Sequence, residues 1–168
     1  MNASKFFLKA ANSLITAIVA LFLILAAAYS GYALWDNAQV YAAVDDVQSE
    51  LMKLKPDPEQ KDGGASFEEL RKINPDVCGW ITLDHTKIDY PILQGEDNLT
   101  YINTDVYGDF ALSGSIFLDS GCDNTFQGKY SLLYGHHMAN HKMFGDLDLY
   151  RKKKFFDKNT TGTLILLD

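Results

Sequence analysis

A long uncharged run near the N-terminus sets the first limit on the fold. Residues 10–35 carry no charged side chain, and Leu14 through Ala28 are almost all apolar. A helix needs about 20 apolar residues to cross the hydrocarbon core of a bilayer, so this run is long enough. It lacks a polar face, which argues against a helix buried in a soluble core. We therefore expect residues 1–35 to form a cytoplasmic tip and a transmembrane anchor.

The charges that flank this run predict its orientation. Lys5 and Lys9 precede it and Asp36 follows it. Because positive residues favour the cytoplasmic side, we expect a single-pass cell-membrane protein with a cytoplasmic N-terminus and an extracellular domain. A signal peptide cleaved after Ala26–Ala28 is the alternative. The run is longer than a usual signal core, which favours the retained anchor, and both interpretations export the domain.

The charge of the exported part excludes some partners. Residues 36–168 hold all 22 acidic residues but only 13 of the 15 basic ones. An acidic domain lacks the basic surface that nucleic acid requires, so we expect no nucleic-acid partner. The same charge argues against binding of acidic lipid through the domain surface. The two cysteines, Cys78 and Cys122, are too few for a disulfide framework, although a single bridge between them can form in an oxidising compartment.

A helical lead-in should follow the anchor, over residues 36–65. Asp36 could cap a helix, and an apolar stripe then recurs at steps of four and three residues. The stripe consists of Val40, Val44, Val47, Leu51 and Leu54. It predicts a helix that packs on its own domain, and a coiled-coil stalk is the weaker alternative because fewer than three heptads are present. Lys55–Gly64, rich in proline, glycine and charge, should form a linker or exposed loop.

The remaining residues, 66–168, read as a mainly β domain with helical additions. Ser66 and Glu69 have the spacing of a capping box, which predicts a short helix through Ile73 that stops before Pro75. Five strand-like runs follow, and a short helix precedes the last of them. The strands are expected at 79–83, 87–92, 114–118, 130–134 and 163–167, with a hairpin turn at 84–86 and the helix at 143–150. This order favours a β-barrel or sandwich.

The chain stops at Asp168, directly after the last strand-like run. A strand at that place would need partners on both edges, and four earlier strands are few for closing a barrel. We therefore expect an incomplete barrel whose C-terminal part is missing from the sequence.

The densest chemical signal is the segment from Tyr134 to His141, which holds three of the four histidines. His136 directly follows a predicted strand, and imidazole can carry protons in either direction near neutral pH. His137 and His141 would share one face if the segment were helical, which leaves a metal site as an alternative. Two ligands do not make a site, and no glutamate completes a His-Glu-x-x-His motif. Histidines hydrogen-bonded in a surface loop are a further alternative.

Neither cysteine has the surroundings of a nucleophile. Cys78 begins an apolar strand, where a thiol is usually inert packing. Cys122 lies in an acidic turn-like loop, where carboxylates raise a thiol pKa. No serine stands in a Gly-x-Ser-x-Gly elbow.

Six blocks of sequence nevertheless resemble one family, the class B sortases, in that family's order. The resemblance runs from about Ser66 to the end of the chain. The blocks are Asn74–Ile81, Ile88–Gly95, Asn98 with Tyr101–Asn103, Gly114–Asp119, Tyr134–Met138 and Met143–Leu147.

The resemblance implies a β-barrel enzyme with extra N-terminal helices and no cofactor or metal, on the outer face of a Gram-positive membrane. Such a cysteine transpeptidase cleaves a C-terminal sorting signal of secreted proteins after its threonine. It holds the acyl part as a thioester and passes it to an amine of cell-wall peptide or of a pilin. By position His136 matches the catalytic histidine, whereas Asn98 and Ile102 match residues that line the sorting-signal groove. His137 stands where the family often has asparagine, so it is not assigned the catalytic role.

The chain departs from the family pattern in two places. The family's nucleophile lies in a Thr-x-x-Cys block downstream of the histidine, and its oxyanion-stabilising arginine lies further on; the sequence ends before both. Cys78 and Cys122 precede the histidine, and Arg151 comes too early and belongs to a charge run. We therefore expect the chain as written not to transpeptidate. A membrane-tethered, non-catalytic extracellular binding module is the alternative function, and a histidine metal site is a third.

Overall fold

A computed structural model describes residues 3–57, 59 and 65–167. The chain divides into two compact units, residues 1–39 and 40–168. Helix α1, Ala3–Met52, begins in the first unit and ends in the second. The prediction that Asp36 caps a separate helix was therefore wrong. Residues 36–52 contain no proline or glycine, so a helix that has already nucleated continues through them.

In the first unit the apolar side chains of α1 are exposed, as Phe22 and Leu25 illustrate with 68% and 60% exposure. The helix is long and apolar enough to cross a membrane by length and composition. Residues 10–35 would extend about 39 Å as an ideal helix, which exceeds a hydrocarbon core of about 30 Å. A helix with apolar side chains exposed all round is what a lipid environment accommodates.

In the second unit the last turns of α1 pack on the domain core. Val44 and Leu51 are buried, and Val47 and Leu54 are half-buried against the same core. The predicted packing of the apolar stripe on its own domain is thus confirmed. The predicted linker, Lys55–Gly64, includes Pro58 and residues 60–64, which lie outside the described residues.

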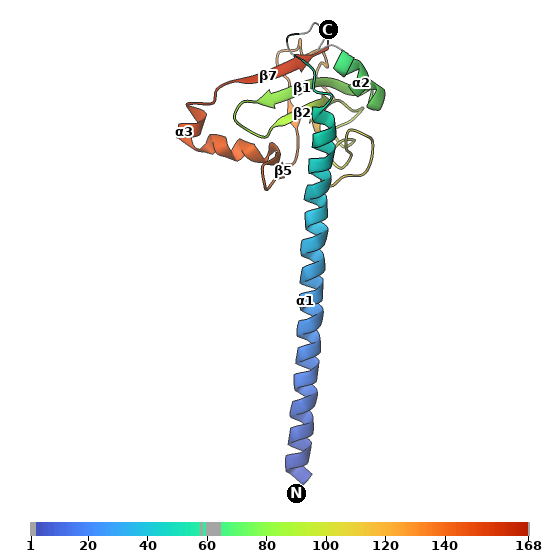
Figure 1. The fold of residues 1–168 in the computed structure, drawn as a ribbon, viewed down its shortest axis with the longest axis vertical. Helices are drawn as coiled ribbons and strands as arrows, with labels where there is room; N and C mark the ends of the chain where they lie inside the picture. Colours follow the sequence, from blue (N-terminus) through green and yellow to red (C-terminus); the bar gives the residue numbers. More distant parts are fainter. Residues whose placement is uncertain (1–2, 58, 60–64, 168) are drawn as a thin grey trace. The chain divides into compact units, whose positions relative to one another are not determined.

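Helix α2, Ala65–Ile73, has bounds close to the prediction, although Ser66 lies one residue inside it. Its amphipathic pattern buries Phe67 and Leu70 in the core, and it ends two residues before Pro75. The helix therefore covers part of the sheet described next (Figure 1).

A five-stranded mixed sheet forms the centre of the second unit, in the order β4-β3-β2-β1-β7. Figure 1 labels β2, β1 and β7 of this sheet. Only the β2–β3 pair is parallel. The strands are β1 Val77–Leu83, β2 Asp89–Leu93, β3 Ile116–Leu118, β4 Leu133–Tyr134 and β7 Gly162–Leu166. The β1–β2 hairpin was predicted, and β4 is shorter than predicted because the short β3 offers it only two partner residues. Within the described part of the chain the sheet is open, and β7 pairs only with β1.

Two short strands and two short helices lie between β4 and β7. Strands β5, His137–Met138, and β6, Lys142–Met143, form a two-stranded hairpin. A 3-10 helix η2, Phe144–Arg151, follows where the sequence predicted a short helix, and α3, Lys153–Phe156, comes next.

Around β1, β2 and β3 apolar side chains are buried on both faces of the sheet, because alternate side chains of a strand point to opposite faces. In β3, Ile116 and Leu118 join one apolar cluster with Ile92, whereas Phe117 joins another with Trp80. Phe117 therefore marks the face from which the candidate site is built.

Candidate functional site

A groove of about 370 Å³ lies at the β3–β4 end of the sheet. It is lined by Asn98, Ile102, Phe117, Tyr134, Gly135 and His136. The three residues that the sequence singled out, Asn98, Ile102 and His136, thus come together at one place although 38 positions separate the first from the last. Their roles there stay a prediction.

The sheet and one glycine position the histidine. Strand register sets Tyr134 opposite Phe117, with ring centroids 5.3 Å apart. A Cβ on Gly135 would lie 2.3 Å from Cδ1 of Ile116, so a larger residue here would require the Ile116 side chain to shift. His136 follows, and its carbonyl oxygen accepts a 2.9 Å hydrogen bond from the Phe144 N–H. The backbone of His136 is therefore held on both sides.

The imidazole of His136 is exposed but not free. Its Nε2 lies 2.8 Å from the backbone carbonyl oxygen of Ile102. This contact ties the histidine to the opposite wall of the groove, which is built from the segment after β2.

One carboxylate holds two wall residues of the groove. Asp119 Oδ2 accepts hydrogen bonds from Asn98 Nδ2 at 2.8 Å and from the Tyr134 hydroxyl at 3.0 Å. The Gly121 N–H donates to the other oxygen at 2.9 Å. The Gly121 N–H, then Asn98 and Tyr134, lower the pKa of Asp119, because each stabilises the ionised carboxylate. Asn98 Oδ1 accepts from the Ser120 N–H at 2.7 Å, so both ends of the amide are fixed.

Sequence reasoning missed the role of Asp119 and of Tyr134. Both residues stood in the quoted blocks, and a polar residue directly after a buried strand is a signal that could have been used. The cross-strand pairing of β3 with β4, which sets Asp119 near Tyr134, could not be deduced from spacing.

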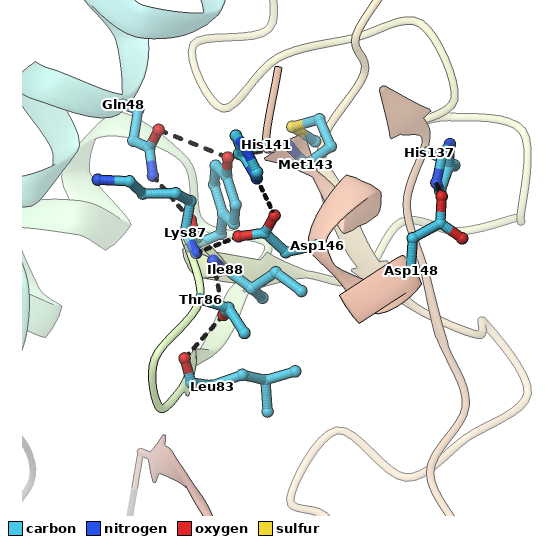
Figure 2. A network of polar contacts seen from close by, with 11 residues as sticks. Gln48, Leu83, Thr86, Lys87, Ile88, His137, His141, Met143, Asp146 and Asp148 are labelled. Carbon is cyan, nitrogen blue, oxygen red and sulfur yellow. Dashed lines mark hydrogen bonds and ion pairs between the residues drawn. The ribbon is translucent and has the colours of Figure 1, made fainter. Parts of the chain in front are cut away.

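The other two histidines of the segment point to different carboxylates (Figure 2). His137 Nε2 lies 2.9 Å from Asp148 Oδ2, and His141 Nδ1 lies 2.5 Å from Asp146 Oδ1. The metal-site alternative required a helix here, but the segment is the β5–β6 hairpin, with Asn140 and His141 at positive φ. Among the residues that the structure describes, no group of three His, Cys, Asp or Glu side chains could hold a metal ion.

Asp146 links the hairpin to the β1–β2 turn (Figure 2). It is 3% exposed, and its second oxygen accepts a 2.6 Å hydrogen bond from the Lys87 N–H in the β1–β2 turn. The Met143 N–H donates to the Tyr90 hydroxyl oxygen at 3.0 Å. Lys142 of β6 pairs with Asp45 of α1. The β5–β6 hairpin, which directly follows His136, is thereby braced by the β1–β2 hairpin and by the last turns of α1.

Neither cysteine lines the groove. Both are free, so the bridge between them that the sequence left open is not formed. Cys78 is buried, and burial raises the pKa of its thiol to about 12. Its Sγ donates a weak 3.5 Å hydrogen bond to the Ile92 carbonyl. A protonated, buried thiol is a poor nucleophile, as the sequence predicted.

Arg151 also lies away from the groove. Its side chain is 83% exposed and approaches Asp148 at 3.6 Å. It belongs to the solvated charge run that the sequence indicated.

Comparisons with known proteins identify the family. Sortase B of Listeria monocytogenes is 35% identical over 135 residues, which cover 78% of this chain and 54% of that protein. Sortase B of Staphylococcus aureus is 41% identical over 93 residues, which cover 55% of this chain and 38% of that protein. The crystal structure of sortase B from B. anthracis matches with a TM-score of 0.72 and 32% identity, over 77% of this chain and 63% of that chain. No family model matches the chain.

These matches support a class B sortase over the part of the family that the chain spans. The predicted sortase-like β fold with N-terminal helices is confirmed by the structural match. Sortase homology supports a cysteine transpeptidase family in general. The chain spans 38% and 54% of the length of the two curated relatives, so the activity of the whole sortase is a matter for proposal.

Proposed function

We propose that residues 66–167 supply the histidine and the substrate groove of a sortase-type cysteine transpeptidase. The enzyme would cleave a C-terminal sorting signal of secreted proteins and join them to cell-wall peptide or to a pilin amine. The observation that carries this proposal is the convergence of Asn98, Ile102 and His136 on one groove. In it His136 acts as the general acid and base, and Asn98 and Ile102 contact the sorting signal.

The groove has the composition that recognition of an extended peptide requires. Phe117, Tyr134 and Ile102 offer apolar surface, and Asn98 offers a fixed amide. An open groove between a sheet edge and a loop accepts a linear peptide more readily than a folded surface. The acidic charge of the domain fits a peptide partner better than nucleic acid.

The 168 residues by themselves should bind without turning over a sorting signal. Acyl transfer by a sortase needs a thiolate near the histidine. Cys78 is buried with a raised pKa, and neither Cys78 nor Cys122 lines the groove. A catalytic unit that lacks its nucleophile retains only background catalysis.

Residues 10–35 of α1 would anchor this function in the cell membrane. With Lys5 and Lys9 on the cytoplasmic side, the domain would face the outside, where secreted substrates leave the membrane. A tether raises the local concentration of substrate and lipid-linked wall precursor around the groove.

Reading the gene beyond the codon for Asp168 gives the first test. We expect an in-frame Thr-x-x-Cys motif followed by an arginine codon. In that longer form, His136→Ala should reduce cleavage of a sorting-signal peptide by at least about 10³-fold, because removing one member of a catalytic unit removes most of its effect. Mass spectrometry of the released C-terminal fragment measures the rate.

His137→Ala is the matched control, since it removes a neighbouring imidazole that binds Asp148 outside the groove. Its rate should stay within about tenfold of the parent, a change of about 1.4 kcal/mol in the barrier. Equal losses of rate from both substitutions would show that the catalytic role had been assigned to the wrong imidazole. An in-frame stop directly after Asp168 would leave the binding module as the function of this chain.

A further inference from the structure

The contact between His136 and Ile102 determines which ring nitrogen carries hydrogen. Nε2 lies 2.8 Å from the Ile102 carbonyl oxygen, and a carbonyl oxygen can only accept a hydrogen bond. Nε2 must therefore be the donor, and in the neutral ring the lone pair is on Nδ1. We infer that the Ile102 carbonyl is a positioning group that fixes His136 in the Nε2–H tautomer. Nδ1 is then the nitrogen that exchanges the proton. Gly114 keeps the Ile102 carbonyl in place.

The carbonyl is held by its neighbours in the fold. The Ser115 N–H donates to the Tyr101 carbonyl at 3.0 Å, and Tyr101 is itself 4% exposed. Ile102 packs against the same core cluster. The segment that carries the carbonyl therefore cannot turn without disturbing buried groups.

Gly114 makes this arrangement possible. Its φ is +55°, and a Cβ at this position would lie 2.2 Å from the Ile102 carbonyl oxygen. Real Cβ atoms do not approach so closely, so any side chain here would displace the carbonyl from its place beside His136. A glycine 22 positions before the histidine thus acts on it through one backbone oxygen.

The consequence for proton transfer is simple. When Nδ1 takes a proton, the ring becomes an imidazolium that still carries Nε2–H, and the hydrogen bond to Ile102 is retained and strengthened. When Nδ1 releases the proton, the same tautomer returns without rotation of the ring. The catalytic meaning of this step rests on the proposed function, but the tautomer itself does not.

The other histidines supply internal standards. His141 uses Nδ1 toward Asp146, so it should be in the Nδ1–H form. His137 uses Nε2 toward Asp148, so it should be in the Nε2–H form. One spectrum of one sample therefore contains both reference states.

Nuclear magnetic resonance of the full 168-residue chain in detergent micelles, labelled with ¹⁵N-histidine, tests the inference at alkaline pH, where an ordinary imidazole is neutral. Signals are assigned by replacing each histidine with glutamine in turn. We expect His136 in the Nε2–H form alone, with a Hε2 proton slow enough in exchange to be observed. Gly114→Ala should cause loss of that proton signal and the appearance of the Nδ1–H form.

Gly108→Ala is the matched control. Its φ is +87°, so it imposes a similar backbone strain, but no atom lies within 4 Å of the added Cβ. It should leave the His136 signals unchanged. Finding wild-type His136 in the Nδ1–H form overturns the inference, and this outcome does not depend on whether Gly114→Ala folds. A Hε2 signal that survives in a folded Gly114→Ala protein also overturns it. Failure of the turnover test with these spectra as expected would overturn the proposed function alone.

Discussion

At the scale of the residue, the groove depends on groups that carry no chemistry of their own. Gly135 lets the chain pass close to Ile116, and Asp119 holds Asn98 and Tyr134 with one carboxylate. Gly135 thus helps to fix the path of the backbone, and Asp119 fixes two side chains of the groove wall. Preorganised walls reduce the entropy that a bound peptide must otherwise lose, so Asp119 should affect binding although it does not line the groove.

Cys78 gives a prediction at this scale, on the dependence of stability on pH. Burial raises the folded-state pKa of its thiol from 9.0 to about 12. Between these values the unfolded thiol loses its proton and the folded one keeps it, so the folded state binds more protons and stability falls as pH rises. Cys78→Ala should remove a slope of at most about 1.4 kcal/mol per pH unit from the free energy of unfolding between pH 9 and 12.

Urea unfolding of both proteins across that pH range measures the difference. Burial also raises the pKa of Tyr101 to about 12. Tyr101 is present in both proteins, so its contribution to the pH slope cancels in the difference. Identical slopes for wild type and Cys78→Ala would show that the thiol ionises in the folded state. Cys122→Ala is the control, because Cys122 is only half-buried.

At the scale of the element, α1 combines two kinds of surface in one helix. Its side chains over residues 10–35 are exposed and apolar, whereas Val44 and Leu51 lie in the core of the second unit. Gln48 of the same helix donates to the carbonyl oxygen of Lys87 at 3.4 Å, next to the Asp146 contact (Figure 2). The last turns of α1 are therefore part of the domain and brace the loop that follows His136.

Leu51→Ala tests this brace. Leu51 is 4% exposed in the core, so its truncation should lower the free energy of unfolding by about 2–4 kcal/mol. Urea unfolding followed by fluorescence of the buried Trp80 measures the loss. Met52→Ala, at the next position with 40% exposure, should change stability by less than about 0.5 kcal/mol. Similar effects from both would mean that these turns do not pack on the domain in solution.

At the scale of the whole molecule, the two compact units differ in the solvent that suits them. The first exposes apolar side chains along a helix long enough to span a bilayer, and the second buries both faces of a sheet. A class B sortase homologue with such a helix is a candidate for an anchored enzyme of the cell envelope.

Membrane retention of the intact chain is the prediction at this scale. After expression in a Gram-positive host, the protein should stay in the membrane fraction through an alkaline wash, with a mass that includes residues 1–35. Protease added outside should cut the second unit. Leu21→Arg together with Leu25→Arg should release the protein, since each arginine at the centre of a span costs about 2.5–3.5 kcal/mol. A mature N-terminus after Ala28 would instead identify a signal peptide.

Much of the fold followed from local patterns. Alternation, capping and turn residues predicted α2, the β1–β2 hairpin, β3 and β7 close to their observed places. The separate helix from Asp36 was wrong, because a capping residue does not end a helix that is already growing. The strand predicted at 130–134 is longer than the observed β4, because the length of β4 depends on the partner residues that β3 offers.

Sequence alone identified the apolar helix, the family and the three residues proposed for the site, because hydropathy and ordered motifs are properties of neighbouring residues. It could not place Asn98, Ile102 and His136 around one groove, since strand register and the close approach of Gly135 to Ile116 bring them together. It also gave no partner for the imidazoles of His136, His137 and His141. The tertiary structure distinguishes them by partner: one backbone carbonyl and two carboxylates. The choice of proton-bearing nitrogen follows from that partner alone, because a carbonyl oxygen has no hydrogen to give.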